Sequence, residues 1–150
     1  MRAPSSALVV DSAILIAAAR GKSSGAIAVA ARRAALVTTD RVVEETRRRI
    51  ELGLNRPDLL AVVDKLISQM TIVPVTALAS VLSTSELSLK EAVASRNGSV
   101  RDTHVLALAW SIEADIWSTD RDFAGTGVAT WSTPNLMSAL AETAHEESPP

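Results

Sequence analysis

The sequence contains no cysteine among its 150 residues. This absence excludes disulfide bonds and metal sites built from thiolates, and a cytoplasmic protein is the simplest interpretation. Aromatic side chains are scarce as well, with three Trp, one Phe and no Tyr. Recognition of RNA bases by aromatic stacking therefore has no visible support in the sequence.

Long apolar runs and an excess of one charge are also missing. The longest apolar stretch, residues 7–19, is interrupted by Asp11 and is too short to span a bilayer. The same aspartate, together with a lone N-terminal cation at Arg2, argues against a signal peptide. The formal net charge is only -2, so a nucleic acid would have to be bound by a local basic patch.

What the chain does contain is an alternation of strand-like and helical segments. Its 47% hydrophobic fraction fits one domain with a substantial core. The alternation predicts an α/β fold of three layers, with a mostly parallel central sheet of about five strands and helices on both faces. We expect this domain to cover residues 1–144 and residues 145–150 to form a disordered tail, because the end is acidic and closes with two prolines.

The expected elements follow from apolar periodicity and from glycine and proline positions. Strands are predicted over residues 7–11, 36–38, 71–75, 115–119 and 128–131, and Pro74 places the third of these at an edge of the sheet. Helices are predicted over residues 12–19, 26–35, 41–52, from Pro57 or Asp58 to about Met70, twice within 77–95, and over 101–112 and 136–144.

Two of the predicted strands lead into aspartates. Asp11 ends the first strand, and Asp120 and Asp122 follow the strand at residues 115–119. Ligands of open parallel sheets bind at the carboxyl ends of the strands, and clustered carboxylates repel unless they hold a cation. The pattern predicts a metal site at this edge. The alternatives are a helix N-cap for Asp11 and a polar turn for the other two.

The helix predicted over residues 101–112 contributes a further acid. Asp102 projects onto the same stripe as Val105, Leu106 and Ala109, one turn earlier, and so points toward the domain. The alternative is a capping box in which Asp102 stands three positions after the N-cap. His104 projects away from this stripe, and we expect it at the surface.

The helix predicted over residues 41–52 carries two neighbouring glutamates. Glu44 projects to the solvated side, whereas Glu45 projects to the flank of the core stripe, so Glu45 is the preferred site residue. The alternative is a pair of surface ion pairs, Glu44 with Arg48 and Glu45 with Arg49. Arg49 flanks Glu45 and is the best candidate for a phosphate contact, although a solvated helix face also explains the basic run 47–49.

Two other acids are given local roles. Asp40 is expected to cap the helix that follows it, and Asp115 is expected in a turn before a strand. Neither residue is assigned to the metal site.

Four segments resemble the PIN domain, the fold of VapC-type toxin ribonucleases. They are residues 9–16, 39–45, 101–109 and 116–123, and the similarity extends over most of the chain. The resemblance implies that Asp11, Glu45, Asp102 and Asp120 are the metal-binding and catalytic acids, with Asp122 as an accessory. Ser12 and Thr119 match small polar positions of the family, whereas Ala13 stands where a serine or threonine is common.

The resemblance also implies a reaction, the hydrolysis of RNA phosphodiesters with Mg²⁺ or Mn²⁺. Carboxylates select such hard cations, and the scarcity of histidine disfavours zinc. Asp11 and Asp102 would hold the principal ion and Asp120 would position it, while Glu45 would bind a second ion or orient the attacking water. The implied partners are an RNA substrate, an antitoxin protein and a second copy of the chain. Helices 26–36 and 58–70 could serve a partner, the homodimer or the core.

Other classes remain as alternatives. A PIN fold without activity would bind RNA or a protein partner and cleave nothing. A phosphoacceptor signalling domain would need paired acids after the first strand and a lysine after a late strand, and the sequence has neither. A phosphatase of the haloacid dehalogenase type would need a second aspartate where Ala13 stands.

Overall fold

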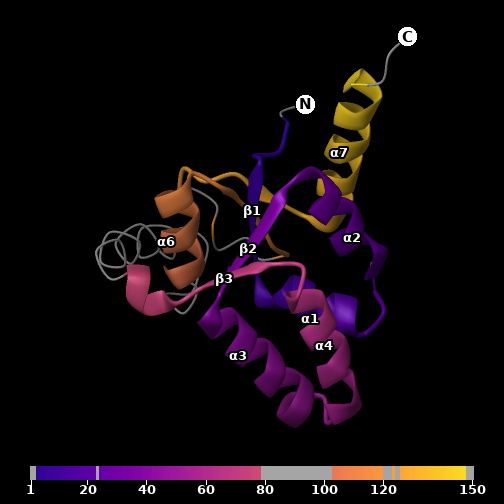
Figure 1. Cartoon of the computed structure of the whole chain (residues 1–150), viewed down its shortest axis with the longest axis vertical. Helices are drawn as coiled ribbons and strands as arrows, with labels where there is room; N and C mark the ends of the chain where they lie inside the picture. The colour runs from indigo at the N-terminus through magenta and orange to yellow at the C-terminus, as the bar shows by residue number, and fades with distance from the viewer. Residues whose placement is uncertain (1–2, 23, 79–102, 120–122, 124–125, 148–150) are drawn as a thin grey trace.

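The computed structural model describes residues 3–22, 24–78, 103–119, 123 and 126–147 (Figure 1). Five strands form one sheet in the order β3-β2-β1-β4-β5, and every neighbouring pair is parallel. The strands are β1 (Ala7–Val10), β2 (Ala35–Thr39), β3 (Thr71–Val73), β4 (Asp115–Trp117) and β5 (Thr130–Trp131). The predicted α/β fold is confirmed, and β3 lies at an edge as Pro74 indicated.

β1 is the central strand, and it pairs with β2 on one side and with β4 on the other. In this register Val9 lies opposite Val37 of β2 and Ile116 of β4. The chain passes from β1 outward to β2 and β3, and then returns to the other side of β1 as β4 and β5. The strand order therefore reverses at β1, and open α/β sheets bind their ligands outside the carboxyl ends of the strands at such a point.

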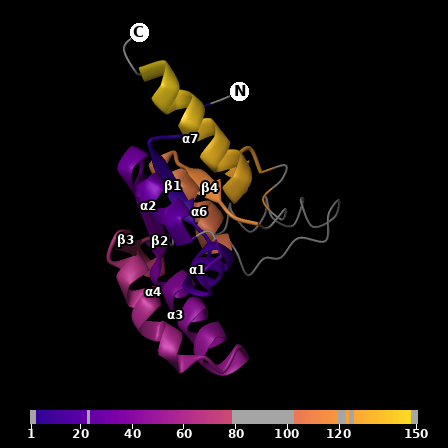
Figure 2. The same ribbon diagram turned by 90° about the vertical axis from the view of Figure 1, so that its right-hand side faces the viewer.

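Helices cover both faces of the sheet and produce three layers (Figures 1 and 2). On one face, α6 (Thr103–Ile112) packs against β1, β2 and β4. On the other face, α2 (Ser24–Arg33) packs against β2, with α1 (Ser12–Ala19) and α7 (Thr133–Glu147) beside it. Because both faces are covered, the central strand β1 is apolar throughout; its residues Leu8, Val9 and Val10 are fully buried.

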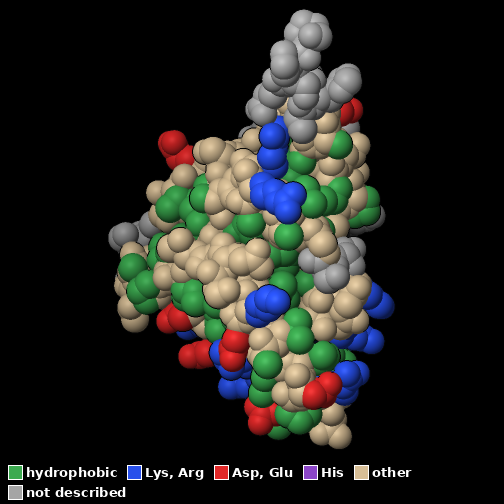
Figure 3. Space-filling view, turned by 45° about the vertical axis from the view of Figure 1, so that its right-hand side comes forward, with side chains coloured by type: hydrophobic (Ala, Val, Ile, Leu, Met, Phe, Trp, Pro, Cys, Tyr) green, Lys and Arg blue, Asp and Glu red, His purple; other side chains and the backbone are tan. Residues whose placement is uncertain are grey.

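A second group of helices lies at the carboxyl edge of the sheet. After β2 the chain forms α3 (Asp40–Arg48), which continues as the π-helical turn η1 (Arg49–Gly53). The short η2 (Pro57–Leu59) and α4 (Leu60–Ile67) return it to β3, and η3 (Val75–Leu78) follows. α3 and α4 pack against each other and against α1. Charged side chains of both signs gather over this end of the molecule (Figure 3).

Most element boundaries agree with the sequence prediction to within a few residues. α7 is longer than predicted, since it begins at Thr133 and continues to Glu147. The division into a domain 1–144 and a tail 145–150 stays a prediction, and residues 148–150 lie outside the described part. Most of the two helices expected within 77–95 also falls outside it. None of the described helices has both the length and the apolar character needed to cross a membrane.

Candidate functional site

Asp11 is the first residue after β1, at the point where the strand order reverses. Its side chain is 4% exposed. Oδ1 accepts a hydrogen bond of 2.8 Å from the backbone N–H of Ser12, and Oδ2 accepts one of 2.7 Å from the hydroxyl of Ser118. The extended backbone of Asp11 makes it the N-cap of α1. The carboxylate of Asp11 therefore caps α1 and also lies at the carboxyl edge of the sheet, so the two interpretations of this residue do not exclude each other.

Ser118 holds the matching position after β4. The backbone N–H of Asp11 donates to the carbonyl of Trp117 at 3.1 Å, and the N–H of Ser118 donates to the carbonyl of Trp131 at 3.0 Å. The ladder thus continues past the strand ends and fixes both residues. Ser118 is buried, and its bond to Asp11 is charge-assisted if the carboxylate is ionised. The sequence does not single out Ser118, because a serine at a strand end has no distinguishing pattern until the β1–β4 register is known.

Glu45 and Glu44 lie on different sides of α3, as the helix projection predicts. Glu45 is half-buried and Glu44 is exposed. α3 packs against α1, the helix that begins directly after Asp11. Neither glutamate forms an ion pair with any described residue, so the predicted pairs with Arg48 and Arg49 are not observed.

The basic residues of this region divide into paired and unpaired guanidinium groups. Arg47 pairs with Asp64 of α4, and Arg56 pairs with Asp58 at 2.9 Å. Arg48 and Arg49 are exposed and make no ion pair with a described residue. Arg48 and Arg49, three and four residues after Glu45, are therefore available to a charged partner, as is the exposed Arg41 in the first turn of α3.

His104 is buried, so the prediction that it lies at the surface is wrong. It is 2% exposed in the first turn of α6, and its Nδ1 shares a hydrogen bond of 2.9 Å with Oγ1 of Thr39. Burial is the main reason that the pKa of His104 falls from 6.5 to about 4; the charge of Arg41 lowers it further and that of Asp40 opposes the shift. The imidazole is therefore neutral at pH 7.

Asp40 and Asp115 are structural anchors of a kind that the sequence did not indicate. The N-cap of α3 is Thr39, whose Oγ1 accepts from the N–H of Val42 at 3.0 Å. Asp40 is the first residue of α3 and accepts from the N–H of Val75 at 2.9 Å. Asp115 begins β4 and does not lie in a turn; its carboxylate accepts from the indole N–H of Trp131 at 2.9 Å.

The structure therefore gathers part of the predicted site at one edge. Asp11, Ser12 and Ser118 lie together there, and Thr119 follows as an exposed residue. The helix α3, which carries Glu45, packs against α1, the helix that Asp11 caps. Asp102, Asp120 and Asp122 fall outside the described residues.

Within the described part of the chain, no three Asp, Glu or His side chains are close enough to hold a metal. Asp11 supplies carboxylate oxygens, the donors that hard divalent cations prefer.

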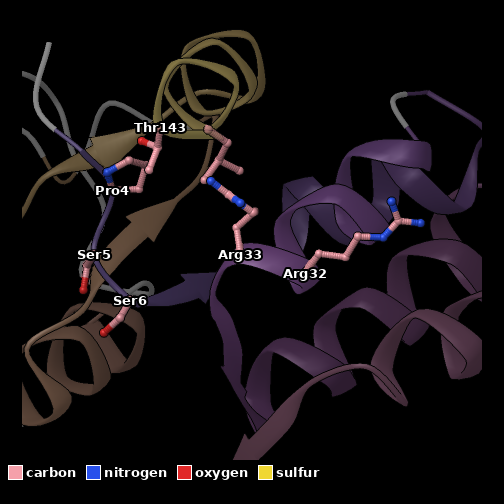
Figure 4. A pocket seen from close by; sticks show the side chains of 7 residues that line it. Pro4, Ser5, Ser6, Arg32, Arg33 and Thr143 are labelled. Atoms are coloured by element: carbon pink, nitrogen blue, oxygen red, sulfur yellow. The ribbon is translucent and has the colours of Figure 1, made fainter. Parts of the chain in front are cut away.

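A pocket of about 380 Å³ lies at the opposite, amino edge of the sheet. It is lined by Pro4, Ser5, Ser6, Arg32, Arg33, Leu140 and Thr143. Arg33 extends toward Pro4 and Thr143, whereas Arg32 points away from them (Figure 4). Ser6 precedes β1 and Arg33 precedes β2, so this pocket is separate from the site of Asp11.

The parallel sheet and the buried acid at its switch point place the chain among the open α/β domains. Residues 9–141 match the PIN domain family. The match covers most of the chain, and the protein belongs to this family.

Two solved structures show how widely the fold is shared. VapBC2 from Rickettsia felis, bound to a DNA fragment from their promoter, aligns with a TM-score of 0.65 at 11% identity over 84% of this chain and 98% of that one. PAE2754 from Pyrobaculum aerophilum aligns with a TM-score of 0.62 at 21% identity over 90% of this chain and 89% of that one. No curated protein matches the sequence.

Proposed function

We propose that the protein is an endoribonuclease dependent on Mg²⁺ or Mn²⁺, and the toxin of a toxin–antitoxin pair. The observation that carries this proposal is the buried Asp11 carboxylate, held at the switch point of a PIN domain by the hydroxyl of Ser118. A carboxylate of this kind, oriented by an outer hydrogen-bond donor, is typical of metal-binding acids.

The four acids have distinct roles in this proposal. Asp11 and Asp102 hold the principal ion, Asp120 positions it directly or through water, and Glu45 holds a second ion or orients the attacking water. Asp122 is an accessory. A bound divalent ion lowers the pKa of water to give a nucleophile at neutral pH, and it stabilises charge on the phosphate.

The chain order supports a place for the other acids near Asp11. Asp102 directly precedes Thr103, the first residue of α6, in the sequence. The next residue, His104, contacts Thr39 at the end of β2. Asp120 comes two residues after Ser118, which contacts Asp11 directly. Both neighbours belong to the carboxyl edge of the sheet, where Asp11 lies.

RNA would approach along α3. Arg49 is exposed one helical turn after Glu45, and Arg48 adjoins it. Arginine contacts with phosphates dominate affinity for nucleic acid and do not depend on sequence. Arg49 is the proposed phosphate contact, with Ser12 and Thr119 as supporting polar groups of the site.

An antitoxin and a second copy of the chain are the proposed protein partners in the cytoplasm. The fold similarity to VapBC2 supports the first. The two helices that the sequence singled out for such partners each carry an exposed apolar side chain, Val29 of α2 and Val62 of α4. A small DNA-binding protein encoded beside this gene would support the pairing.

The activity is tested by incubating the purified protein with total RNA and MgCl₂ or MnCl₂. We expect fragments that carry a 5′-phosphate and a 3′-hydroxyl, and no fragments when EDTA is present. RNA that binds but stays intact with either ion would instead identify a binding module. Phosphorylation of Asp11 by a small phosphodonor would identify the signalling alternative.

A further inference from the structure

Thr39 joins three elements at the carboxyl edge of the sheet. It is the last residue of β2, and its Oγ1 caps α3 by accepting from the N–H of Val42 at 3.0 Å. The same oxygen lies 2.9 Å from Nδ1 of His104, in the first turn of α6. A single hydroxyl therefore links the end of β2 to the starts of two helices, α3 and α6.

The Thr39–His104 hydrogen bond is buried. Thr39 is fully buried and His104 is 2% exposed, so solvent cannot replace the hydrogen bond if one partner is removed. The neighbouring Thr38 is buried too, and its hydroxyl donates to the carbonyl of Val10 at 2.8 Å, just before Asp11. The end of β2 is thus fixed both to α6 and to the strand that carries Asp11.

We propose that the Thr39–His104 hydrogen bond is a positioning contact for the metal site, which holds the start of α3 in register with the start of α6. The inference rests on the proposed nuclease function. In that function α3 supplies Glu45, and α6 begins one residue after Asp102. Two ligands 57 positions apart in the sequence would then depend on one buried bond for their relative placement, as outer-shell partners do in other metal sites.

The geometry suits this role because the bond acts at helix starts. Fixing the N-cap of α3 limits both rotation and sliding of that helix, and Glu45 lies six residues after the cap. A shift of about 1 Å in a catalytic group is enough to lower rates by about 100-fold. His104 is a positioning residue in this account and touches neither metal nor RNA.

The test compares His104→Leu with His104→Asn in the full-length protein. Leucine removes Nδ1 and leaves the Thr39 cap intact, whereas the amide of asparagine can take the place of Nδ1. We expect His104→Leu to bind Mn²⁺ about 10- to 100-fold more weakly, measured by electron paramagnetic resonance without RNA. We expect kcat for RNA cleavage to fall with it and KM to change little, and His104→Asn to restore Mn²⁺ affinity to within about 3-fold of the wild type.

A stability control separates positioning from general loss of structure. Ile27→Ala empties a buried position in α2, away from this bond, and should lower the melting temperature without weakening Mn²⁺ binding. Wild-type affinity in folded His104→Leu would overturn the inference, and so would an equal loss of affinity in folded Ile27→Ala. If the wild type itself neither binds Mn²⁺ nor cleaves RNA, the proposed function fails and this inference fails with it.

Discussion

The hydroxyl of Ser118 donates a hydrogen bond of 2.7 Å to the carboxylate of Asp11, across the junction of β1 and β4. The two residues are 107 positions apart in the sequence, and each directly follows its strand. Their bond joins the two strands at which the strand order reverses. It fixes the acid that the proposed chemistry needs most.

Ser118→Ala should weaken metal binding while leaving the fold in place. The change removes the donor to Oδ2 of Asp11, and loss of an outer-shell partner lowers metal affinity by about 10- to 100-fold. The lost hydrogen bond should reduce the free energy of unfolding by about 1–3 kcal/mol. Mn²⁺ titration and urea denaturation measure the two effects.

Ser111→Ala is the matched control for that experiment. Ser111 donates to the carbonyl of Leu108 within α6 and has no contact with Asp11. The Ser111→Ala variant should therefore bind Mn²⁺ with the affinity of the wild type. Equal affinities in all three proteins would show that Ser118 does not orient a metal ligand.

Glu45→Gln should reduce RNA cleavage at least 100-fold, and Glu44→Gln should leave it nearly unchanged. The first change removes a carboxylate from the half-buried flank of α3, and the second removes one from its solvated side. Neither glutamate forms an ion pair with a described residue. The free energy of unfolding of both variants should therefore lie within about 0.5 kcal/mol of the wild-type value. The opposite order of cleavage rates would assign the site to Glu44.

Arg49→Ala should weaken RNA binding and lower its dependence on salt. Removing one phosphate contact reduces the slope of log K against log salt by about 1. The measurement is fluorescence polarisation of a labelled RNA in EDTA, so that no cleavage occurs. Arg56→Ala is the control, because Arg56 is already paired with Asp58. An unchanged slope in Arg49→Ala would remove this residue from the RNA path.

The stability of the metal-free protein should fall as the pH drops from 6.5 toward 4. The pKa of His104 is about 4 in the folded protein, against 6.5 in the unfolded chain, because burial disfavours its charged form. The unfolded chain therefore binds a proton first, and the stabilisation present above pH 6.5 is lost through this range. Between pH 7.5 and 5 the loss should be about 2 kcal/mol.

His104→Leu isolates this contribution. The variant lacks the imidazole, so its free energy of unfolding should change less over the same pH interval in urea denaturation with EDTA. All other ionisable residues are the same in both proteins, so the difference between the two pH slopes isolates His104. The same pH slope in both proteins would show that His104 is not the group responsible.

The sequence predicted what depends on apolar patterning. Buried parallel strands have continuous apolar sequences. The sequence alone could therefore predict β1 and the position of Asp11 at its end. Glu45 was separable from Glu44 because α3 has one buried face and one solvated face. A helix with two distinct faces gives a reliable projection.

Helix projection gave a wrong result for α6, which has no separate buried and solvated faces in its first two turns. α6 is buried at every position from Thr103 to Ala109, so no face of this segment marks the solvent, and the projection misplaced His104. Asp115 and Ser118 depend on partners far along the chain, namely Trp131 and Asp11. Such contacts exist only once the register of β1, β4 and β5 is set, and local pattern does not specify it.

The most direct measurement is the rate of RNA cleavage by the wild type and by Asp11→Asn, with Asp58→Asn as the exposed control. Asparagine keeps the shape of Asp11 but removes the charge that a divalent cation requires. We predict metal-dependent cleavage by the wild type and by Asp58→Asn, and a loss of at least 1000-fold in Asp11→Asn with its circular dichroism spectrum unchanged. Metal-dependent cleavage by Asp11→Asn at the wild-type rate would contradict the account.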